Sequence, residues 1–431
     1  MFQTWRNAFK QEDLRKKIVY TIIILVLYRL GSALTVPFLD PTALQQMIGG
    51  GADFLSYLDI MTGGALGNAT IFAMSITPYI NASIIIQLLT IALPPLERLA
   101  KEGGDGRKKI QAITRYTTLA LALIQATAFY LVLRNTGGVL EYTSGFAGVF
   151  SALVIIGSFT AGTCVVVWLG DQISAKGIGN GISIILFTGI LSRGPQAFQM
   201  LMAWWKMGSS EPKYYFLVPA IVVIFAAMIG FIVFMTNAER RIPVSYAKRI
   251  VGRKMYGGQN THIPIKVNMT GVMPIIFAMS FMQIPNMIGT FVSVKEGGFW
   301  DGFFQLFQYN NPFYGILYFL LILGFNYYYT AIQYNPVEIA NGLRKNNGAI
   351  PGIRPGKPTV DFISKIISKI TLLGALFLGI IAVFPILFSA LTKANVSLGG
   401  TSILIVVGVA LETMRTLESQ MTMRHHKGFL E

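Results

Sequence analysis

Long apolar runs separated by short polar connections make up most of the sequence. A helix rises about 1.5 Å per residue, so roughly 20 mostly apolar residues are needed to cross about 30 Å of hydrocarbon. The sequence predicts ten membrane-spanning helices, at 18–36, 71–93, 115–133, 149–169, 181–202, 215–236, 269–291, 313–333, 366–389 and 401–417. The pattern therefore favours an all-α polytopic membrane protein.

The first apolar run, Ile18 to Val36, is about as long as a full span, and no small-residue cleavage site follows it. We therefore expect it to remain as the first span rather than to be removed as a signal peptide. This leaves residues 1–17 as an N-terminal segment and residues 418–431 as a C-terminal tail.

The composition supports a membrane location. The chain of 431 residues is 53% hydrophobic and only 13% charged, with a mean hydropathy of +0.57. A water-soluble domain does not need so much apolar surface to form its core. The net charge of +16 could indicate a nucleic-acid binder, but the basic residues come in clusters between apolar runs. That distribution is typical of membrane orientation signals.

Lysine and arginine are distributed asymmetrically between the two sets of connections. If the N-terminus is cytosolic, 28 of the 35 basic residues lie on the cytosolic side. Arg29 lies within the first span, where its guanidinium group would reach the interface or a carbonyl partner. Six lie on the other side, namely Arg134, Arg193, Lys206, Lys213, Lys295 and Lys393. The positive-inside rule therefore predicts that both termini are cytosolic.

Three segments between the spans have a distinctive composition. Asn237–Asn268 and Tyr334–Lys365 are long and basic and are predicted to protrude as cytosolic loops that carry a binding surface. Asp53–Ala69 is too short and interrupted to span, yet too apolar for a solvated loop. We expect it to be a re-entrant or interfacial segment.

Signatures of enzymes and metal sites are weak in this sequence. There is no GxxxxGK phosphate loop, no HExxH and no pair of cysteines. The alternate glycines of 177–181 precede an apolar span instead of following a strand, which argues against a nucleotide site. The neighbouring His425 and His426 are expected in a solvated tail. The single Cys164 is expected to be a small buried hydrophobic residue.

Ion-coupled transporters usually carry acidic residues near the middle of the bilayer, and none of the ten predicted runs has one there. Asp171, Glu239 and Glu412 fall near span ends, where water and headgroups can solvate them. These features favour a passive pore that is driven by another protein and has no catalytic apparatus of its own.

Five stretches of the sequence carry a family resemblance. They are TIFAMSITPYINASIIIQLLT (70–90), GIGNGISII (177–185), THIPIKVN (261–268), PGIRPG (351–356) and GGTSILIVV (399–407). Together and in this order they closely resemble the SecY family, whose members form the central pore subunit of the bacterial Sec protein translocase. The resemblance covers essentially the whole chain.

The resemblance implies a clamshell of two pseudo-symmetric inverted halves around a central pore, here 18–202 and 215–417, joined by an external connection at 203–214. It implies a protein-conducting channel in a bacterial plasma membrane that passes unfolded preproteins across and releases membrane segments laterally. The expected partners are SecE, SecG, the SecA ATPase, the ribosome, signal peptides and membrane lipids. No cofactor and no enzymatic activity are expected, because SecA hydrolyses the ATP.

The resemblance also implies roles for residues of the pore. A ring of bulky aliphatic side chains would form the narrow waist, at Ile76, Ile80, Ile182, Leu186, Ile276 and Ile405. Such side chains exclude water and ions without holding a passing peptide; ordinary packing against lipid or helices is the alternative.

A plug helix would lie on the outer side of the waist, with Tyr57, Leu58, Ile60, Met61, Gly63, Gly64, Leu66 and Gly67. The plug glycines would be either hinges or turn formers.

Two further sets of residues follow from the resemblance. A lateral gate between the second and seventh spans would include Pro78, Ile84, Gln87, Pro274, Met282 and Pro285, with the prolines interrupting the spans. A surface for SecA and the ribosome would include Arg354, Arg253, Lys254, Arg240, Arg241, Lys248 and Arg249. Positive-inside topology alone is an alternative explanation for the basic residues other than Arg354.

Two other classes of protein remain as alternatives. A secondary transporter shares inverted repeats and broken helices, but it should carry polar or ionic groups at mid-membrane. A membrane insertion factor without a continuous pore would present a polar groove and would not need a plug.

Overall fold

The computed structural model describes residues 9–49, 59, 62–136, 138–209, 211–246, 249–251, 254–256, 260–291, 298–307, 311–392 and 400–425. Helices form at every one of the ten predicted spans. They are α2 (Glu12–Gly31), α5 (Thr77–Ala92), α7 (Gly104–Thr136), α8 (Gly145–Lys176), α9 (Gly181–Leu191) with α10 (Gly194–Met207), α11 (Lys213–Asn237), α12 (Met273–Phe291), α14 (Pro312–Gln333), α16 (Lys357–Thr392) and α17 (Gly400–His425).

By length and hydropathy alone, five helices of the described residues could each cross a membrane: α7, α8, α11, α14 and α16. A sixth is possible if α5 and α6 (Pro94–Lys101), which are bent by 100° at their junction, form one broken span. The other predicted spans correspond to helices that are charged near their ends, broken or shorter. Large side chains are exposed on the long apolar helices, as lipid contact requires, for example Leu153 of α8, Phe216 of α11 and Ile316 of α14. The chain is a multi-pass membrane protein.

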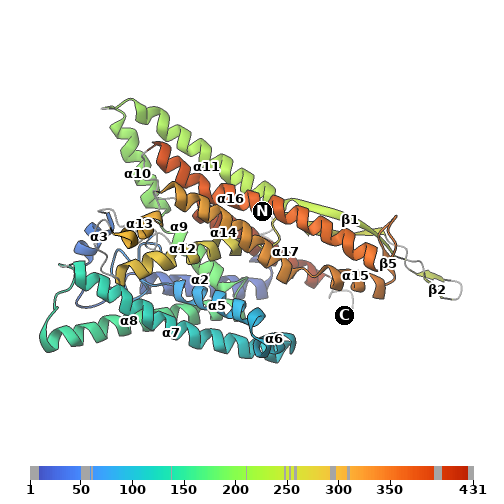
Figure 1. Cartoon of the computed structure of the whole chain (residues 1–431), viewed down its shortest axis with the longest axis horizontal. Coiled ribbons are helices and arrows are strands. Elements are labelled where there is room, and N and C mark those ends of the chain that lie inside the picture. Colours follow the sequence, from blue (N-terminus) through green and yellow to red (C-terminus); the bar gives the residue numbers. More distant parts are fainter. Residues whose placement is uncertain are drawn as a thin grey trace.

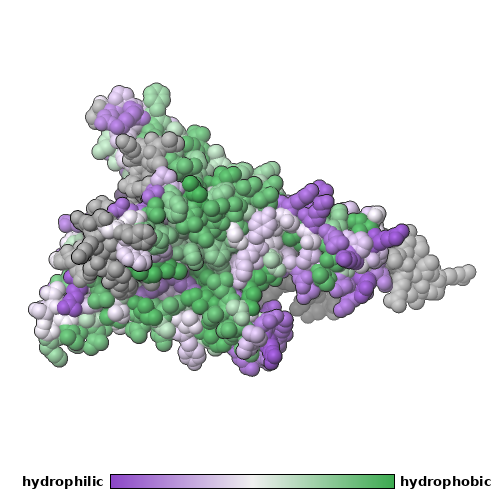
Figure 2. Space-filling model, in the orientation of Figure 1, coloured by the Kyte–Doolittle hydropathy of each residue, from purple (hydrophilic) through white to green (hydrophobic). Residues whose placement is uncertain are grey.

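Two ends of the helical bundle are distinguished by their short elements. The helices α3 (Pro41–Gly49), α10 and α13 (Phe299–Leu306) lie at one end (Figure 1). At the other end lie α6, α15 (Pro336–Lys345) and a group of strands (Figure 1). Figure 2 shows hydrophobic residues over the helical body and hydrophilic residues gathered toward the end with the strands. We refer to these as the α10 end and the sheet end.

The two long basic loops pair with each other in a small sheet, which the sequence did not predict. Strand β1 (Glu239–Tyr246) is central, with β4 (Asn260–Lys266) on one side and β5 (Gly348–Ala349) on the other. In the antiparallel register Ser245 pairs with Ala349. A separate hairpin joins β2 (Arg249–Val251) to β3 (Lys254–Tyr256). The prediction that the loops 237–268 and 334–365 lie on the same side is therefore confirmed.

The start of α2 and the later part of α17 lie near this same end. The buried residues Leu14 and Ile18 of α2 pack with Ile178 and with Leu417 of α17. In addition, an Arg415 Nη atom donates to the backbone oxygen of Thr236 at 3.1 Å, next to the start of the sheet. The beginning of α2 and the later part of α17 thus share one side of the protein with the basic loops.

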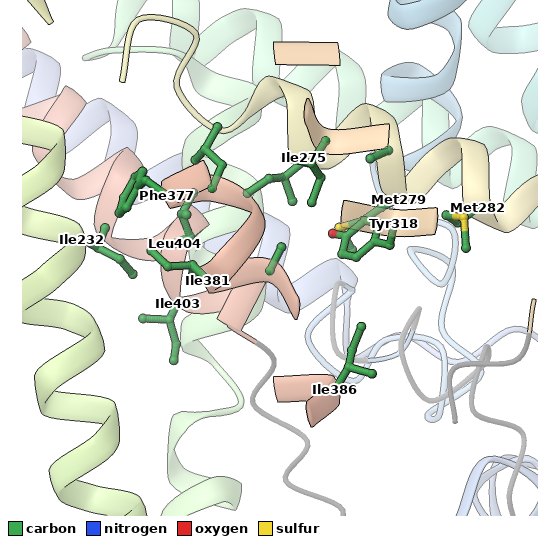
Figure 3. Packing of buried hydrophobic residues seen from close by; sticks show 14 of the residues in the cluster. Ile232, Ile275, Met279, Met282, Tyr318, Phe377, Ile381, Ile386, Ile403 and Leu404 are labelled. Atoms are coloured by element: carbon green, nitrogen blue, oxygen red, sulfur yellow. The ribbon is translucent and has the colours of Figure 1, made fainter. Parts of the chain in front are cut away.

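Each half of the bundle has a core of its own. The first half, α2 to α10, contains a buried cluster that extends from Val36 to Phe159. The second half, α11 to α17, contains a cluster that extends from Ile232 to Leu404, with side chains from α11, α12, α14, α16 and α17 pointing toward one another (Figure 3). This division agrees with the predicted fold class of two helical halves.

Three local expectations were wrong. The second span was predicted from residue 71, but its helix begins at Thr77, because Ser75 has a φ of +46° that a helix does not accommodate. The fifth span breaks between α9 and α10. Cys164 is exposed on α8 instead of buried. Arg29, expected within the first span, lies in the last turn of its helix α2.

Candidate functional site

The predicted waist residues gather in an apolar cluster between the two halves. Within this waist cluster Ile76 is 0% exposed, Leu186 8% and Ile405 2%, while Ile80 and Ile182 pack against it as partly buried side chains. The cluster combines α5 and α9 of the first half with α17 of the second. Its buried members are Ile24, Tyr28, Phe72, Ile76, Val166, Leu169, Ile173, Ile184, Ile185, Leu186, Ile190, Ile405 and Val409.

The sixth predicted waist residue, Ile276, is half-buried on α12 and is not a member of the waist cluster. Its neighbour one turn earlier, Val272, packs against the cluster, and the Ile276 amide donates to the Val272 carbonyl at 3.2 Å. The structure therefore brings together five of the six residues and places the sixth next to a residue that contacts them.

Local sequence determines where α9 presents Ile182 and Leu186. Asn180 caps the helix, and its side-chain oxygen accepts hydrogen bonds from the backbone amides of Ile182 and Ser183 at 3.1 and 3.4 Å. At position 181 a Cβ would lie 2.0 Å from the Gly170 carbonyl oxygen, so only glycine permits this close approach of α8 and α9. The GIGNG motif thus starts α9 tightly against α8.

Most of the described part of the predicted plug folds differently from the predicted helix. Asp59 is helical, residues 62–69 form successive turns and not a helix, and Tyr57, Leu58, Ile60 and Met61 lie outside the described residues. Gly63 and Gly64 have φ values of +69° and +86°, which assigns them to turns in this conformation. Leu66 is buried in the core of the first half, and the Gly67 amide donates to Asp59 Oδ1 at 2.6 Å.

A charged pair that the sequence did not indicate joins the plug segment to the end of α9. Asp59 is only 4% exposed, and its carboxylate pairs with the guanidinium group of Arg193 in the break between α9 and α10. The Ser192 hydroxyl also donates to the Gly63 carbonyl oxygen at 3.4 Å. Ile178, just before α9, packs with Leu14 and Leu417, whereas Arg193 follows the last residue of α9, so the plug segment lies at the opposite end of α9 from these residues.

The predicted gate helices α5 and α12 contact each other. Pro78 and Pro274 stand in the first turns of α5 and α12, where the missing N–H costs nothing, so they begin these helices and do not interrupt them. Only Pro285 lies inside its helix. Among the remaining predicted gate residues, Ile84 and Met282 are buried and Gln87 is exposed.

A hydrogen bond connects the two halves beside these helices. The Tyr329 hydroxyl of α14 donates to Gln87 Oε1 of α5. The Tyr329 ring lies against Phe277 of α12, with the ring centroids 4.9 Å apart. Tyr329 therefore contacts both predicted gate helices. Its contact with α5 is a hydrogen bond from the hydroxyl, which a change to phenylalanine would remove without the ring.

Arg354 is exposed in a turn at the sheet end, as its flanking turn residues predicted. Gly352 and Gly356 adopt φ values of +83° and +106°, and the Thr359 hydroxyl donates to the Arg354 carbonyl oxygen at 2.9 Å. These contacts hold the backbone of the turn, while the guanidinium group extends from it. The geometry suits a charged side chain that meets a partner.

The other basic residues are distributed over β1 and the adjoining hairpin. Arg240 and Arg241 are exposed near the start of β1, before the buried Ile242 and Val244, and Arg241 Nε donates to Glu239 Oε1 at 2.7 Å. Burial lowers the pKa of Lys266 on β4, and the positive charge of Arg415 lowers it further. Lys248 and Arg253 lie outside the described residues, as do the side chains of Arg249 and Lys254.

These features define a class of protein: a multi-pass membrane protein with two helical halves that meet at an apolar cluster, with a buried turn segment toward one end and basic loops at the other. Comparison with known proteins specifies the class further. The family model described as SecY matches residues 70–414.

A curated relative named Protein translocase subunit SecY, from Streptomyces galbus, is 41% identical over 447 residues and is covered completely, as is this chain. The chain belongs to the SecY family.

Solved structures agree at the level of the fold. A SecY channel studied for its plug domain, which stabilises the closed state and maintains a membrane seal, matches with a TM-score of 0.65 and 18% identity over 94% of this chain and 92% of that one. The Sec61 channel of a canine ribosome–channel complex from the endoplasmic reticulum matches with a TM-score of 0.60 and 17% identity over the same shares.

Proposed function

We propose that this chain is a protein-conducting channel that translocates unfolded secretory polypeptides and releases membrane segments laterally into the bilayer. The observation that carries the proposal is the waist cluster, in which Ile76, Leu186 and Ile405 of the two halves are buried together in a member of the SecY family. Branched side chains that converge on a narrow waist exclude water, yet they form no directional bonds with a passing chain.

The pore would run between the halves, 18–202 and 215–417, with Ile76, Ile80, Ile182, Leu186, Ile276 and Ile405 around its waist. The segment that contains Gly63, Gly64 and Gly67 would be the plug on the outer side. The lateral gate would open between α5 and α12, toward lipid. The contact of α5 with α12 and the burial of Leu66 beside the first half support these assignments.

The driving force would come from partners at the sheet end. Arg354 and the basic residues of β1 and its hairpin would bind the SecA ATPase or the ribosome, and the channel itself would hydrolyse nothing. SecE and SecG would complete the complex. The bacterial relatives and the basic loops support a bacterial plasma membrane with both termini cytosolic. The ribosome-bound Sec61 neighbour supports the ribosome as a partner.

Reconstitution tests the proposal directly. The purified channel complex in proteoliposomes should make a secretory preprotein resistant to external protease when SecA and ATP are supplied, and liposomes without the channel should not. Insertion of membrane segments with no such protection of the preprotein would instead indicate an insertion factor. Uptake of small solutes alone would indicate a transporter.

A further inference from the structure

The plug segment is organised around one buried carboxylate. Besides pairing with Arg193, Asp59 accepts hydrogen bonds from the Gly67 amide on Oδ1 at 2.6 Å and from the Gly64 amide on its carbonyl oxygen at 2.8 Å. The Thr62 hydroxyl donates to the same carbonyl oxygen at 3.1 Å. The residue that holds Arg193 therefore also determines the fold of the turns.

The end of α9 meets these turns at backbone level. A Cβ on residue 63 would lie 2.5 Å from the Gly189 carbonyl oxygen, so the plug segment packs directly on the last turn of α9. The Ser192 hydroxyl donates to the Gly189 carbonyl oxygen at 2.6 Å and lies 3.4 Å from that of Gly63. The backbones of the two segments are therefore in direct contact on this face.

The same helix carries two of the waist residues. Ile182 and Leu186 lie on α9, and Leu186 precedes Arg193 by seven residues, which is about 10 Å along a helical rise. Since α9 is short and regular up to Leu191, its two ends move together. Any displacement of α9 that widens the waist therefore also displaces Ser192 and Arg193.

The Asp59–Arg193 pair has features that allow it both to hold the plug segment against α9 and to separate. Asp59 is almost completely buried, whereas the Arg193 side chain retains 23% exposure, and Arg193 Nε is buried without a hydrogen-bond partner among the described residues. A buried ion pair resists the loss of one member, because the remaining charge would be left desolvated. Because part of the Arg193 side chain is exposed, water can solvate its guanidinium group when the pair separates.

We propose that Asp59 and Arg193 form a latch that couples the plug to the waist, so that movement of α9 releases the plug and closure of the waist seats it again. This rests on the proposed channel function. Asp59 and Arg193 are positioning residues, since they act through the plug and through α9. The latch explains how the waist and the plug open together, because a single movement of α9 acts on both.

A double-mutant cycle tests the coupling. The variants Asp59→Asn, Arg193→Gln and their combination would be compared in planar bilayers as reconstituted channel complexes. Each single change should raise the resting ion conductance several-fold. The combination should raise it no further than the stronger single change, because either one already opens the latch. Lys16→Glu, which breaks the exposed pair of Lys16 with Glu12, is the matched control and should leave conductance unchanged.

A second measurement follows the plug itself. In a Cys164→Ser background, a cysteine at position 65, where Ala65 is 1% exposed, reports whether the segment is seated. Impermeant maleimide should label it slowly in the parent and many times faster in Asp59→Asn and Arg193→Gln.

Unchanged conductance and labelling in both single variants, or single effects that multiply in the combination, would overturn the latch. Translocation driven by SecA in the parent separates this outcome from a failure of the proposed function.

Discussion

Replacing Tyr329 with phenylalanine isolates one hydrogen bond between the two halves. The Tyr329 hydroxyl donates to Gln87 of α5, while its ring packs on Phe277 of α12. Phenylalanine keeps the ring contact and removes only the donor. We expect the closed gate to lose this bond when α5 separates from α12 and α14, so the substitution should favour opening.

The magnitude follows from the environment of the bond. Hydrogen bonds between membrane helices contribute about 0.6 kcal/mol on average, which corresponds to about a threefold change in an equilibrium constant. If the resting gate is mostly closed, the open fraction should rise by about the same factor. Gln87→Leu should produce a similar shift, and the two changes together should add little.

The assay is SecA-driven translocation of a preprotein with a weakly hydrophobic signal peptide, in which gate opening limits the rate. Tyr329→Phe should accelerate it about threefold and should hardly affect a preprotein with a strong signal peptide. Tyr327→Phe, an exposed tyrosine on the same helix, is the matched control. Equal rates for the Tyr329 and Tyr327 variants, or slower translocation in Tyr329→Phe, would refute the reasoning.

Three further predictions concern stability, the motor and the plug. Asn326→Leu removes a buried side chain that accepts a hydrogen bond from Thr270 and donates one to a carbonyl of α16. It should lower the free energy of unfolding in detergent by about 2–4 kcal/mol, whereas Thr127→Val should lower it by under about 1 kcal/mol. Arg354→Glu should abolish SecA-driven translocation with an unchanged melting temperature, while Lys357→Glu at the start of α16 should keep most activity. Deletion of residues 62–67 should raise resting conductance in planar bilayers while translocation persists; an unchanged conductance would show that the waist alone seals.

The membrane-spanning architecture could be predicted from the sequence because a span needs a long apolar run, and all ten runs contain helices. The boundaries were less predictable. Residues 71–76 are apolar enough to extend α5, yet Ala69 and Ser75 adopt positive φ values that begin the helix later. The apolar run 181–202 concealed a break, although Ser192, Arg193 and the following glycine and proline were a visible signal.

Other features depended on contacts between distant residues. β1 and β5 pair across about a hundred positions, and β5 has only two residues, so no local pattern indicated the sheet. Asp59 and Arg193 are similarly remote, and a charge count assigned Arg193 only to a side of the membrane. The waist residues came from family resemblance, since an isoleucine in a span has no sequence feature that separates a pore from ordinary packing.

The central claim, that a translocating polypeptide passes through the waist between the two halves, is tested most directly by site-specific photo-crosslinking. A photoreactive amino acid at Leu186 or at Ile405 should crosslink to a preprotein that is arrested during SecA-driven translocation. The same probe at Leu373, an exposed residue of α16, should not. Crosslinks from Leu373 with none from Leu186 or Ile405 would contradict the account.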